Sequence, residues 1–301
     1  MTQRITPALW GMIAGLALIW GASFLSVRIT LDEVPPLTTA AHRILWAAVA
    51  LWLVMALRGE TLPRGWRIWG IFAVMGFLNN TVPFTFLAWG QQHIEVGLTA
   101  IINASTAIWG VLIASLAFAD ERLTLPRVAG VTLGFLGVAT AIGLDAFASF
   151  DLRSLAQLAV IGATIGYALA GSWGRAMLKG VSPLSASTGM LTMAAAFSVP
   201  VALSAEGAPD LTLAPITWVS LAFNSLVSTA AAYLIYYAIL RRTGAGNLLL
   251  VTLLVAPVAI VLGALLRDEA LSASAFAGFA LLAFGLLVLD GRLMPRRAPA
   301  D

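Results

Sequence analysis

Ten apolar runs follow one another along almost the whole chain and constrain its fold more than any other feature. A helix needs roughly 20 consecutive apolar residues to cross the hydrocarbon of a bilayer. The connections between the runs are short and hold Pro, Gly or charged residues. The sequence therefore predicts an all-α membrane protein with ten transmembrane helices and leaves no segment for a soluble domain. These helices are expected at residues 8–29, 37–57, 67–90, 96–118, 125–144, 154–177, 183–204, 214–239, 246–266 and 271–290.

The composition agrees with a chain embedded in lipid. Of the 301 residues, 60% are hydrophobic and 10% are charged, whereas soluble domains carry about 25% charged residues. The strands of a membrane β-barrel would alternate apolar and polar residues over about ten positions, and the runs here are continuously apolar. The net charge of +3 is small, so it gives no reason to expect a nucleic-acid partner.

Residue counts also exclude several kinds of chemistry. The chain has no cysteine, and its two histidines, His42 and His93, are far apart in the sequence. Disulfides, thiol catalysis and cysteine-based metal sites are therefore excluded, and we expect neither a metal nor another cofactor. An intramembrane enzyme would need a nucleophile–base pair, paired aspartates or a metal motif. The sequence offers none of these, so we do not expect an enzyme.

Basic residues are distributed unevenly between the two sets of connections. Cytoplasmic loops of membrane proteins carry an excess of Lys and Arg. If the N-terminus is inside, the predicted outside loops hold only Arg28, Arg153 and Arg267. This bias predicts that both termini are cytoplasmic. The predicted inside segments then hold Arg4, Arg58, Arg64, Arg67, Arg122, Arg127, Arg175, Lys179, Arg241, Arg242, Arg292, Arg296 and Arg297.

The two halves of the chain resemble each other. An offset of 147 residues aligns Trp20 with Tyr167, and an offset of 148 aligns Glu121 with Glu269. Each half holds five predicted helices, so the second half must enter the membrane from the opposite side. Inverted repeats are typical of secondary transporters, whose substrate site lies near the midplane between the repeats. Exchanging the conformations of the two repeats then gives a route to alternating access.

Two asparagines lie at the middle of the third predicted helix, where polar groups are costly unless they meet a partner or line a wet cavity. Asn79 and Asn80 are followed by Pro83. A proline has no N–H to donate, so Pro83 frees the carbonyl of Asn79 four residues back. The freed carbonyl and the two amides could bind the ammonium or carboxylate of a substrate. The alternative is that they join helices at a kink.

The eighth predicted helix carries a second polar group. Asn224 and Ser228 are four residues apart and share one helix face. An offset of 148 residues aligns Ser228 with Asn80, which favours both as cavity residues. Single Ser and Thr residues in membrane helices also often bond to their own helix, so this second interpretation stays open.

Aromatic residues at membrane depth form another set of candidates. Trp20 lies at the centre of the first predicted helix, and its repeat partner Tyr167 at the centre of the sixth. Asn103 and Trp109 lie at similar depths in the fourth. Aromatic walls suit flat or apolar substrates, since aromatic pairs contribute about 0.5–1.5 kcal/mol beyond area burial. Ordinary packing is the alternative. Toward the inner end of the eighth helix lie Tyr233, Tyr236 and Tyr237.

His42 and Arg43 are adjacent in the second predicted helix, so they point about 100° apart and at most one can face a cavity squarely. No Asp or Glu lies at the middle of a predicted span, which leaves His42 as the only proton-relay candidate there. Facilitated diffusion is therefore favoured over proton antiport. Arg43 could bind a substrate anion or reach the outer headgroups, and a structural role is favoured. Glu121 and Glu269 are expected to cap helices or to pair with neighbouring loops.

Several of these features together resemble the EamA-type branch of the drug/metabolite transporter superfamily. They are the duplicated ten-helix pattern, Asp120-Glu121-Arg122-Leu123 with its echo Asp268-Glu269-Ala270-Leu271, Pro257 in the ninth predicted helix, and Arg43 in the second. The resemblance covers nearly the whole chain. It implies two EamA-like five-helix repeats, residues 1–148 and 149–301, in a bacterial inner (cytoplasmic) membrane.

Length and tryptophan content look closest to aromatic amino-acid exporters of the YddG type. That resemblance implies outward movement of aromatic amino acids and related small metabolites, with membrane lipids as the other partner. A carrier of drugs, nucleosides or sugars with the same fold is the alternative. Gly-x-x-x-Gly motifs allow either internal packing or a dimer face, so the oligomeric state is left open. The predicted substrate-binding residues are Trp20, His42, Asn79, Asn80, Pro83, Asn103, Trp109, Tyr167, Asn224 and Ser228.

Overall fold

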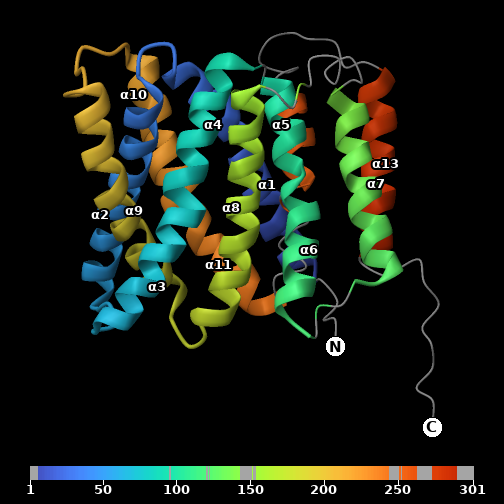
Figure 1. Cartoon of the computed structure of the whole chain (residues 1–301), viewed down its shortest axis with the longest axis horizontal. Coiled ribbons are helices and arrows are strands. Elements are labelled where there is room, and N and C mark those ends of the chain that lie inside the picture. The colour runs from blue at the N-terminus through green and yellow to red at the C-terminus, as the bar shows by residue number, and fades with distance from the viewer. Residues whose placement is uncertain are drawn as a thin grey trace.

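The part of the chain that the structure describes contains helices as its only regular secondary structure (Figure 1). The computed structural model describes residues 6–94, 96–119, 121, 123–142, 151, 154–243, 251, 253–262 and 273–289. The all-α prediction is confirmed for these residues. The helices are α1 (Pro7–Thr30), α2 (Pro36–Arg58), α3 (Trp66–Gly76), η1 (Phe77–Thr81), α4 (Val82–His93), α5 (Val96–Ala104), α6 (Thr106–Ala117), α7 (Leu125–Ile142), α8 (Leu155–Met177), α9 (Pro183–Glu206), α10 (Pro215–Ala222), η3 (Phe223–Ala231), α11 (Ala232–Thr243), residues Leu253–Leu262, and α13 (Ala273–Leu289).

Among the described residues, seven helices are long and apolar enough to cross a membrane. Shorter apolar helices fall within the three remaining predicted spans, in α7, at Leu253–Leu262 and in α13. Every predicted span thus contains helix, and the chain is a multi-pass membrane protein. The seven long candidates are Pro7–Thr30, Pro36–Arg58, Trp66–His93, Leu98–Ala117, Leu155–Met177, Pro183–Glu206 and Pro215–Leu240.

Local sequence signals set the helix ends. Helices α1, α2, α9 and α10 each begin with a proline, whose missing N–H would have no partner in the first turn anyway. Side-chain caps add to this, because Thr6 Oγ1 accepts from Leu9 N at 3.4 Å and Ser182 Oγ accepts from Ser185 N at 3.1 Å. Helix α2 ends at Arg58, and the capping residue Gly59 has a φ of +63°, a left-handed conformation that glycine adopts without strain.

Two of the long helices contain a stretch of π-helix. Segment η1 joins α3 to α4, and segment η3 joins α10 to α11. Pro83 follows η1 and cannot donate to the carbonyl four residues back, so the ladder shifts locally to a bond from Val82 N to Phe77 O. In η3 the ladder ends with Ala232 N, which donates to Val227 O. Such π-helical stretches occur frequently at functional sites.

The helices pack in pairs that run in opposite directions. Gly174 lies beside Met75 and Gly90 beside Val160, so the long helix α3–η1–α4 and helix α8 are antiparallel. On the other side of the bundle, α1 packs against α10 and η3. Other close pairs include α2 with α9 and α7 with α13, and α7 and α13 stand side by side at one end of the bundle (Figure 1).

The α7–α13 pair depends on glycines for its close approach. A Cβ added at Gly278 would lie 2.3 Å from the Ala141 nitrogen, and one at Gly137 would lie 2.5 Å from the Leu282 nitrogen. No side chain fits at either position without moving backbone. Gly137 and Gly278 therefore serve the internal packing of α7 against α13.

Candidate functional site

A cavity of about 170 Å³ lies inside the bundle. Its lining includes Val27 and Gln91, near the ends of α1 and α4, and reaches Glu121, between α6 and α7, and Arg127, in the first turn of α7. The cavity therefore extends along most of the bundle. Four of the ten predicted site residues line it, from four different helices: Trp20, Asn79, Asn103 and Tyr167.

Arg43 contributes a positive charge to the cavity lining. Its side chain is only 9% exposed. The guanidinium donates from Nε to Thr229 Oγ1 at 2.7 Å and from Nη2 to Ser228 Oγ at 3.2 Å. It also lies over the Phe84 ring, 3.9 Å from the centroid. Arg43 therefore does not reach for the headgroups but points inward, held by the π-helical segment η3.

The η3 segment carries the oxygens that accept hydrogen bonds from Arg43. Thr229 Oγ1 donates to the Asn224 carbonyl five residues back at 2.7 Å while it accepts from Arg43. Ser228 is 1% exposed, and its carbonyl accepts from Trp20 Nε1 at 3.0 Å. Ser228 thus lies behind the cavity wall and positions two lining residues. The side-chain amide of Asn224 is also buried and has no hydrogen-bond partner among the described residues.

A second polar group joins η1 to α11. Tyr233 Oη donates to Asn80 Oδ1 at 2.5 Å and accepts from Asn79 Nδ2 at 3.1 Å. Asn79 and Tyr233 line the cavity, whereas Asn80 is fully buried behind them. Pro83 does not line the cavity but packs beside Gly166 of α8. Asn79 therefore forms part of the cavity wall, and both asparagines bond to Tyr233 and so connect the two long π-containing helices.

Aromatic rings form the wall around Arg43. The Trp20 and Tyr236 rings are 6.0 Å apart between centroids, and Tyr167 lines the same cavity. Asn103 adds a buried amide, and its carbonyl accepts from Thr106 Oγ1 at 2.7 Å. The wall thus combines flat apolar surfaces with a few polar groups, which is the usual character of a small-molecule site.

His42 and Trp109 lie outside this lining. His42 Nε2 accepts from Trp46 Nε1 at 3.0 Å, and its ring packs on Trp46 and on Trp218 of α10, with centroids 5.9 and 6.0 Å away. Trp109 Nε1 is buried and has no partner among the described residues. Of the adjacent pair His42 and Arg43, the arginine faces the cavity.

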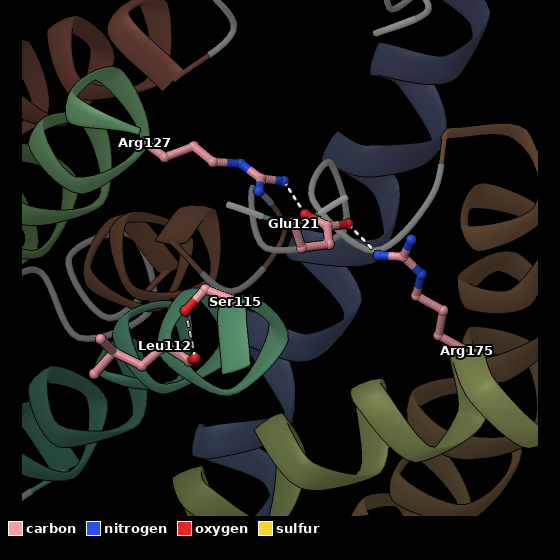
Figure 2. A network of polar contacts seen from close by, with 5 residues as sticks. All are labelled: Leu112, Ser115, Glu121, Arg127 and Arg175. Atoms are coloured by element: carbon pink, nitrogen blue, oxygen red, sulfur yellow. Dashed lines mark hydrogen bonds and ion pairs between the residues drawn. The ribbon is translucent and has the colours of Figure 1, made fainter. Parts of the chain in front are cut away.

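An ion-pair cluster lies at the end of the cavity between α6 and α7. Glu121 forms ion pairs with Arg127 of α7 and Arg175 of α8, and Figure 2 shows its carboxylate between the two guanidinium groups. Arg175 also lies over the Phe118 ring, 4.3 Å from the centroid. Glu121 was expected to cap a helix or to pair with neighbouring loops, and its ion pairs go instead to side chains of helices α7 and α8. Glu269 lies outside the described residues.

The sequence did not single out every lining residue. Gln91 lines the cavity with a buried Oε1 that has no hydrogen-bond partner among the described residues. A signal was present, since an amide in the last turn of an apolar helix is costly unless it lines a polar space. Tyr233 and Tyr236 were noted only for their position near one end of their helix. Among the described residues, no group of three or more His, Cys, Asp or Glu side chains is placed to hold a metal ion.

Comparison with known proteins places the chain in a family. The sequence profile of the EamA-like transporter family matches residues 8–143 and again residues 154–289. The chain belongs to the EamA-like transporter family. The two matches together cover most of the chain. The resemblance to drug/metabolite transporters of the EamA type, expected from the sequence, is therefore confirmed.

Relatives of this EamA-like transporter also carry the names of transporters. The uncharacterized transporter YoaV of Bacillus subtilis (strain 168) is 20% identical over 92% of this chain and 94% of its own length. A probable amino-acid metabolite efflux pump of Salmonella typhimurium (strain LT2) is 27% identical over 91% of each chain. A probable terminal-alkyne amino-acid exporter of Streptantibioticus cattleyicolor is 26% identical over 46% of this chain and 45% of its own. These names indicate a transporter rather than an enzyme.

A solved crystal structure has the same fold. It superposes with a TM-score of 0.73 and covers 93% of this EamA-like transporter and 99% of its own chain. The two sequences are 16% identical, so this likeness concerns the fold alone.

Proposed function

We propose that this chain exports amino acids, with aromatic amino acids favoured, and related small metabolites by alternating access. The observation that carries the proposal is the cavity inside the bundle, whose wall combines the rings of Trp20, Tyr167 and Tyr236 with Arg43 and two asparagines. A flat ring can stack on such walls while the polar end of the substrate meets the charged and amide groups. The relatives that are named as amino-acid efflux proteins support the same substrate class.

The proposed architecture is two inverted five-helix repeats, residues 1–148 and 149–301, that together span the membrane ten times. Three observations support it. The family profile matches each half separately. The π-helical segments η1 and η3 lie at positions that the offset of 148 residues brings together. Finally, helix α8 is antiparallel to α3–η1–α4, as the first helix of an inverted second repeat should be.

Alternating access needs an end of the cavity that can close, and the Glu121 cluster supplies one. One carboxylate holds α7 and α8, which belong to different proposed repeats. The distribution of basic residues supports a cytoplasmic location for this end, in a protein that we propose to lie in a bacterial inner membrane. At the other end, Val27, Leu31 and Ala88 pack together as a buried apolar cluster. Rocking of the repeats would open one closure as the other forms.

Transport is proposed to run down the substrate gradient. No Asp or Glu lies mid-span in the sequence, and His42, the one histidine within a predicted span, packs against Trp46 and Trp218 instead of lining the cavity. Proton antiport is the alternative, because relays of Asp, Glu or His serve proton-coupled carriers.

Counterflow in liposomes tests the proposal. Purified protein in vesicles preloaded with unlabelled phenylalanine should take up labelled phenylalanine saturably, and an imposed pH gradient should not drive accumulation. Trp20→Ala should raise the half-saturating concentration roughly two- to tenfold, as expected for one lost aromatic contact. Trp218→Ala is the matched control, because Trp218 contacts His42 outside the cavity lining.

The competition pattern in the same vesicles decides the substrate class. Tryptophan and tyrosine should compete with labelled phenylalanine better than sugars or nucleosides do. Stronger competition by nucleosides or sugars would favour the broader metabolite carrier. The absence of any counterflow, or an equal loss in both tryptophan variants, would contradict the proposed transport site.

A further inference from the structure

Arg43 is a buried cation that has only neutral partners in the part of the chain that the structure describes. Its side-chain hydrogen bonds go to the hydroxyls of Thr229 and Ser228 and, at 3.5 Å, to the Ser228 carbonyl. No described carboxylate forms an ion pair with it, although ion pairs occur elsewhere in the structure at Asp32 and Glu121. Hydroxyls and the face of the Phe84 ring solvate the charge but do not neutralise it.

An uncompensated charge at this position is expensive. Charged side chains inside a membrane are rare, and those that occur pair with one another or line a pathway. Taking a cation out of water costs several kcal/mol unless an opposite charge compensates for it, so Arg43 favours an anion in the cavity that it lines. Its Nη1 makes no hydrogen bond to the described residues and is left for a ligand, while Nε and Nη2 hold the side chain to η3.

We infer that Arg43 binds the carboxylate of the transported molecule and that the carboxylate, not the ammonium group, is the feature that this site recognises. This inference rests on the proposed function and names the group that selects substrates. A guanidinium matches the planar carboxylate with charge-assisted hydrogen bonds. The aromatic walls formed by Trp20 and Tyr236 then receive the apolar end.

The cavity offers no comparable site for an ammonium. Among its described lining residues the one carboxylate is Glu121, and two arginines already bind it. Amide and carbonyl oxygens such as those of Asn79 and Gln91 can accept a hydrogen bond but carry no charge. Aromatic acids that lack the amino group should therefore bind, whereas aromatic amines that lack the carboxylate should not.

Ligand competition on the unaltered protein tests this directly. In the counterflow assay, 3-phenylpropanoate should inhibit labelled phenylalanine uptake with a half-inhibiting concentration within about tenfold of that of phenylalanine. Removing the carboxylate, as in 2-phenylethylamine, should raise the half-inhibiting concentration roughly ten- to a hundredfold, the range expected for a lost charged hydrogen bond. If the amine competes as well as the acid, the inference is wrong while the transport function stands. If labelled phenylalanine itself is not transported, the proposed function fails first.

Substitution of the arginine separates binding from a structural role. Arg43→Gln should raise the dissociation constant for 3-phenylpropanoate roughly ten- to a hundredfold, and should leave that for the neutral N-acetylphenylalaninamide within about twofold. Both constants are measured by ligand-induced thermal shift in detergent. Arg28→Gln is the control, since Arg28 pairs with Asp32 on the exterior. Equal losses for acid and neutral ligand would mean that Arg43 merely supports the fold. Arg43→Lys, which retains the charge, should keep the preference for the acid if the glutamine variant does not fold.

Discussion

The hydroxyl of Tyr233 connects the two long π-containing helices through a pair of amides. It donates to Asn80 and accepts from Asn79, and all three residues are buried. Tyr233→Phe removes the hydroxyl and leaves both amides without that partner. The free energy of unfolding should fall by about 1–3 kcal/mol, the cost of leaving buried polar groups unpaired. Thermal unfolding in detergent measures the loss.

Tyr237→Phe is the matched control for this prediction. The hydroxyl of Tyr237 is equally buried, but its contact is a long hydrogen bond to the Met190 sulfur at 3.7 Å. A thioether sulfur is a weak acceptor, so this variant should unfold within a few degrees of the unaltered protein. Equal losses in both variants would show that the Asn79–Tyr233–Asn80 contacts do not stabilise the fold.

The sequence could predict which polar residues lie at membrane depth, but not which way each one faces. Trp20, Asn79, Asn103 and Tyr167 were proposed from depth and repeat alignment, and all four line the cavity. The choice between His42 and Arg43 needed the structure. In a soluble helix the apolar face marks the core, whereas lipid and the protein interior are similarly apolar, so that pattern is weak here.

At the scale of helices, a proline marked one of the two π-helical segments, whereas no helix-breaking residue marked the other. Pro83 predicted a freed carbonyl at Asn79, and η1 lies at that position. Segment η3 contains no proline, and the one feature that pointed to its position was the alignment of Ser228 with Asn80. Its shape depends on tertiary contacts, such as the bond from Arg43 to Thr229, which no local pattern encodes.

The glycines of α7 and α13 make a prediction at this scale. Gly278→Ala places a methyl group 2.3 Å from the Ala141 nitrogen, so the helices must separate. Overpacking of this kind costs about 1–3 kcal/mol, and the melting temperature in detergent should fall accordingly. The helical pair, not the cavity, is the element affected.

Gly15→Ala, in α1, is the control for Gly278→Ala, because it makes the same glycine-to-alanine change at a position without close neighbours. Apart from the backbone of its own helix turn, no atom of the described residues lies within 4 Å of the position where its Cβ would be. Alanine exceeds glycine in helix propensity by about 1 kcal/mol, so this variant should be as stable as the unaltered protein or more so. A Gly278→Ala protein that melts no lower than Gly15→Ala would contradict the close packing of α7 and α13.

At the scale of the whole molecule, hydropathy alone was enough to predict a helical, multi-pass membrane protein. This follows because only structures that satisfy every backbone hydrogen bond internally can cross lipid, and continuous apolar runs allow just the helix. The pairing of helices was not predictable in the same way. Contacts such as α3–α4 with α8 depend on where glycines and side chains interlock between segments far apart in sequence.

The proposed closure at Glu121 makes a prediction for the molecule as a whole. Glu121→Gln removes the charge that holds Arg127 and Arg175 together (Figure 2), so states open at this end should gain population. The chain has no cysteine, and Ser172→Cys therefore places a single thiol in the cavity lining. Its labelling rate with a membrane-impermeant maleimide, applied from the Glu121 side, should rise roughly two- to tenfold, since partly exposed ion pairs contribute modestly.

The direction of the change separates a closure from a simple loss of stability. If the cluster holds one end shut, Glu121→Gln should slow labelling of the same thiol from the opposite side, because population shifts from one open state to the other. Asp32→Asn breaks the exposed pair with Arg28 and should alter neither rate. Faster labelling from both sides would mean that the bundle has loosened as a whole. Unchanged labelling would mean that Glu121 supports the fold without controlling access to the cavity.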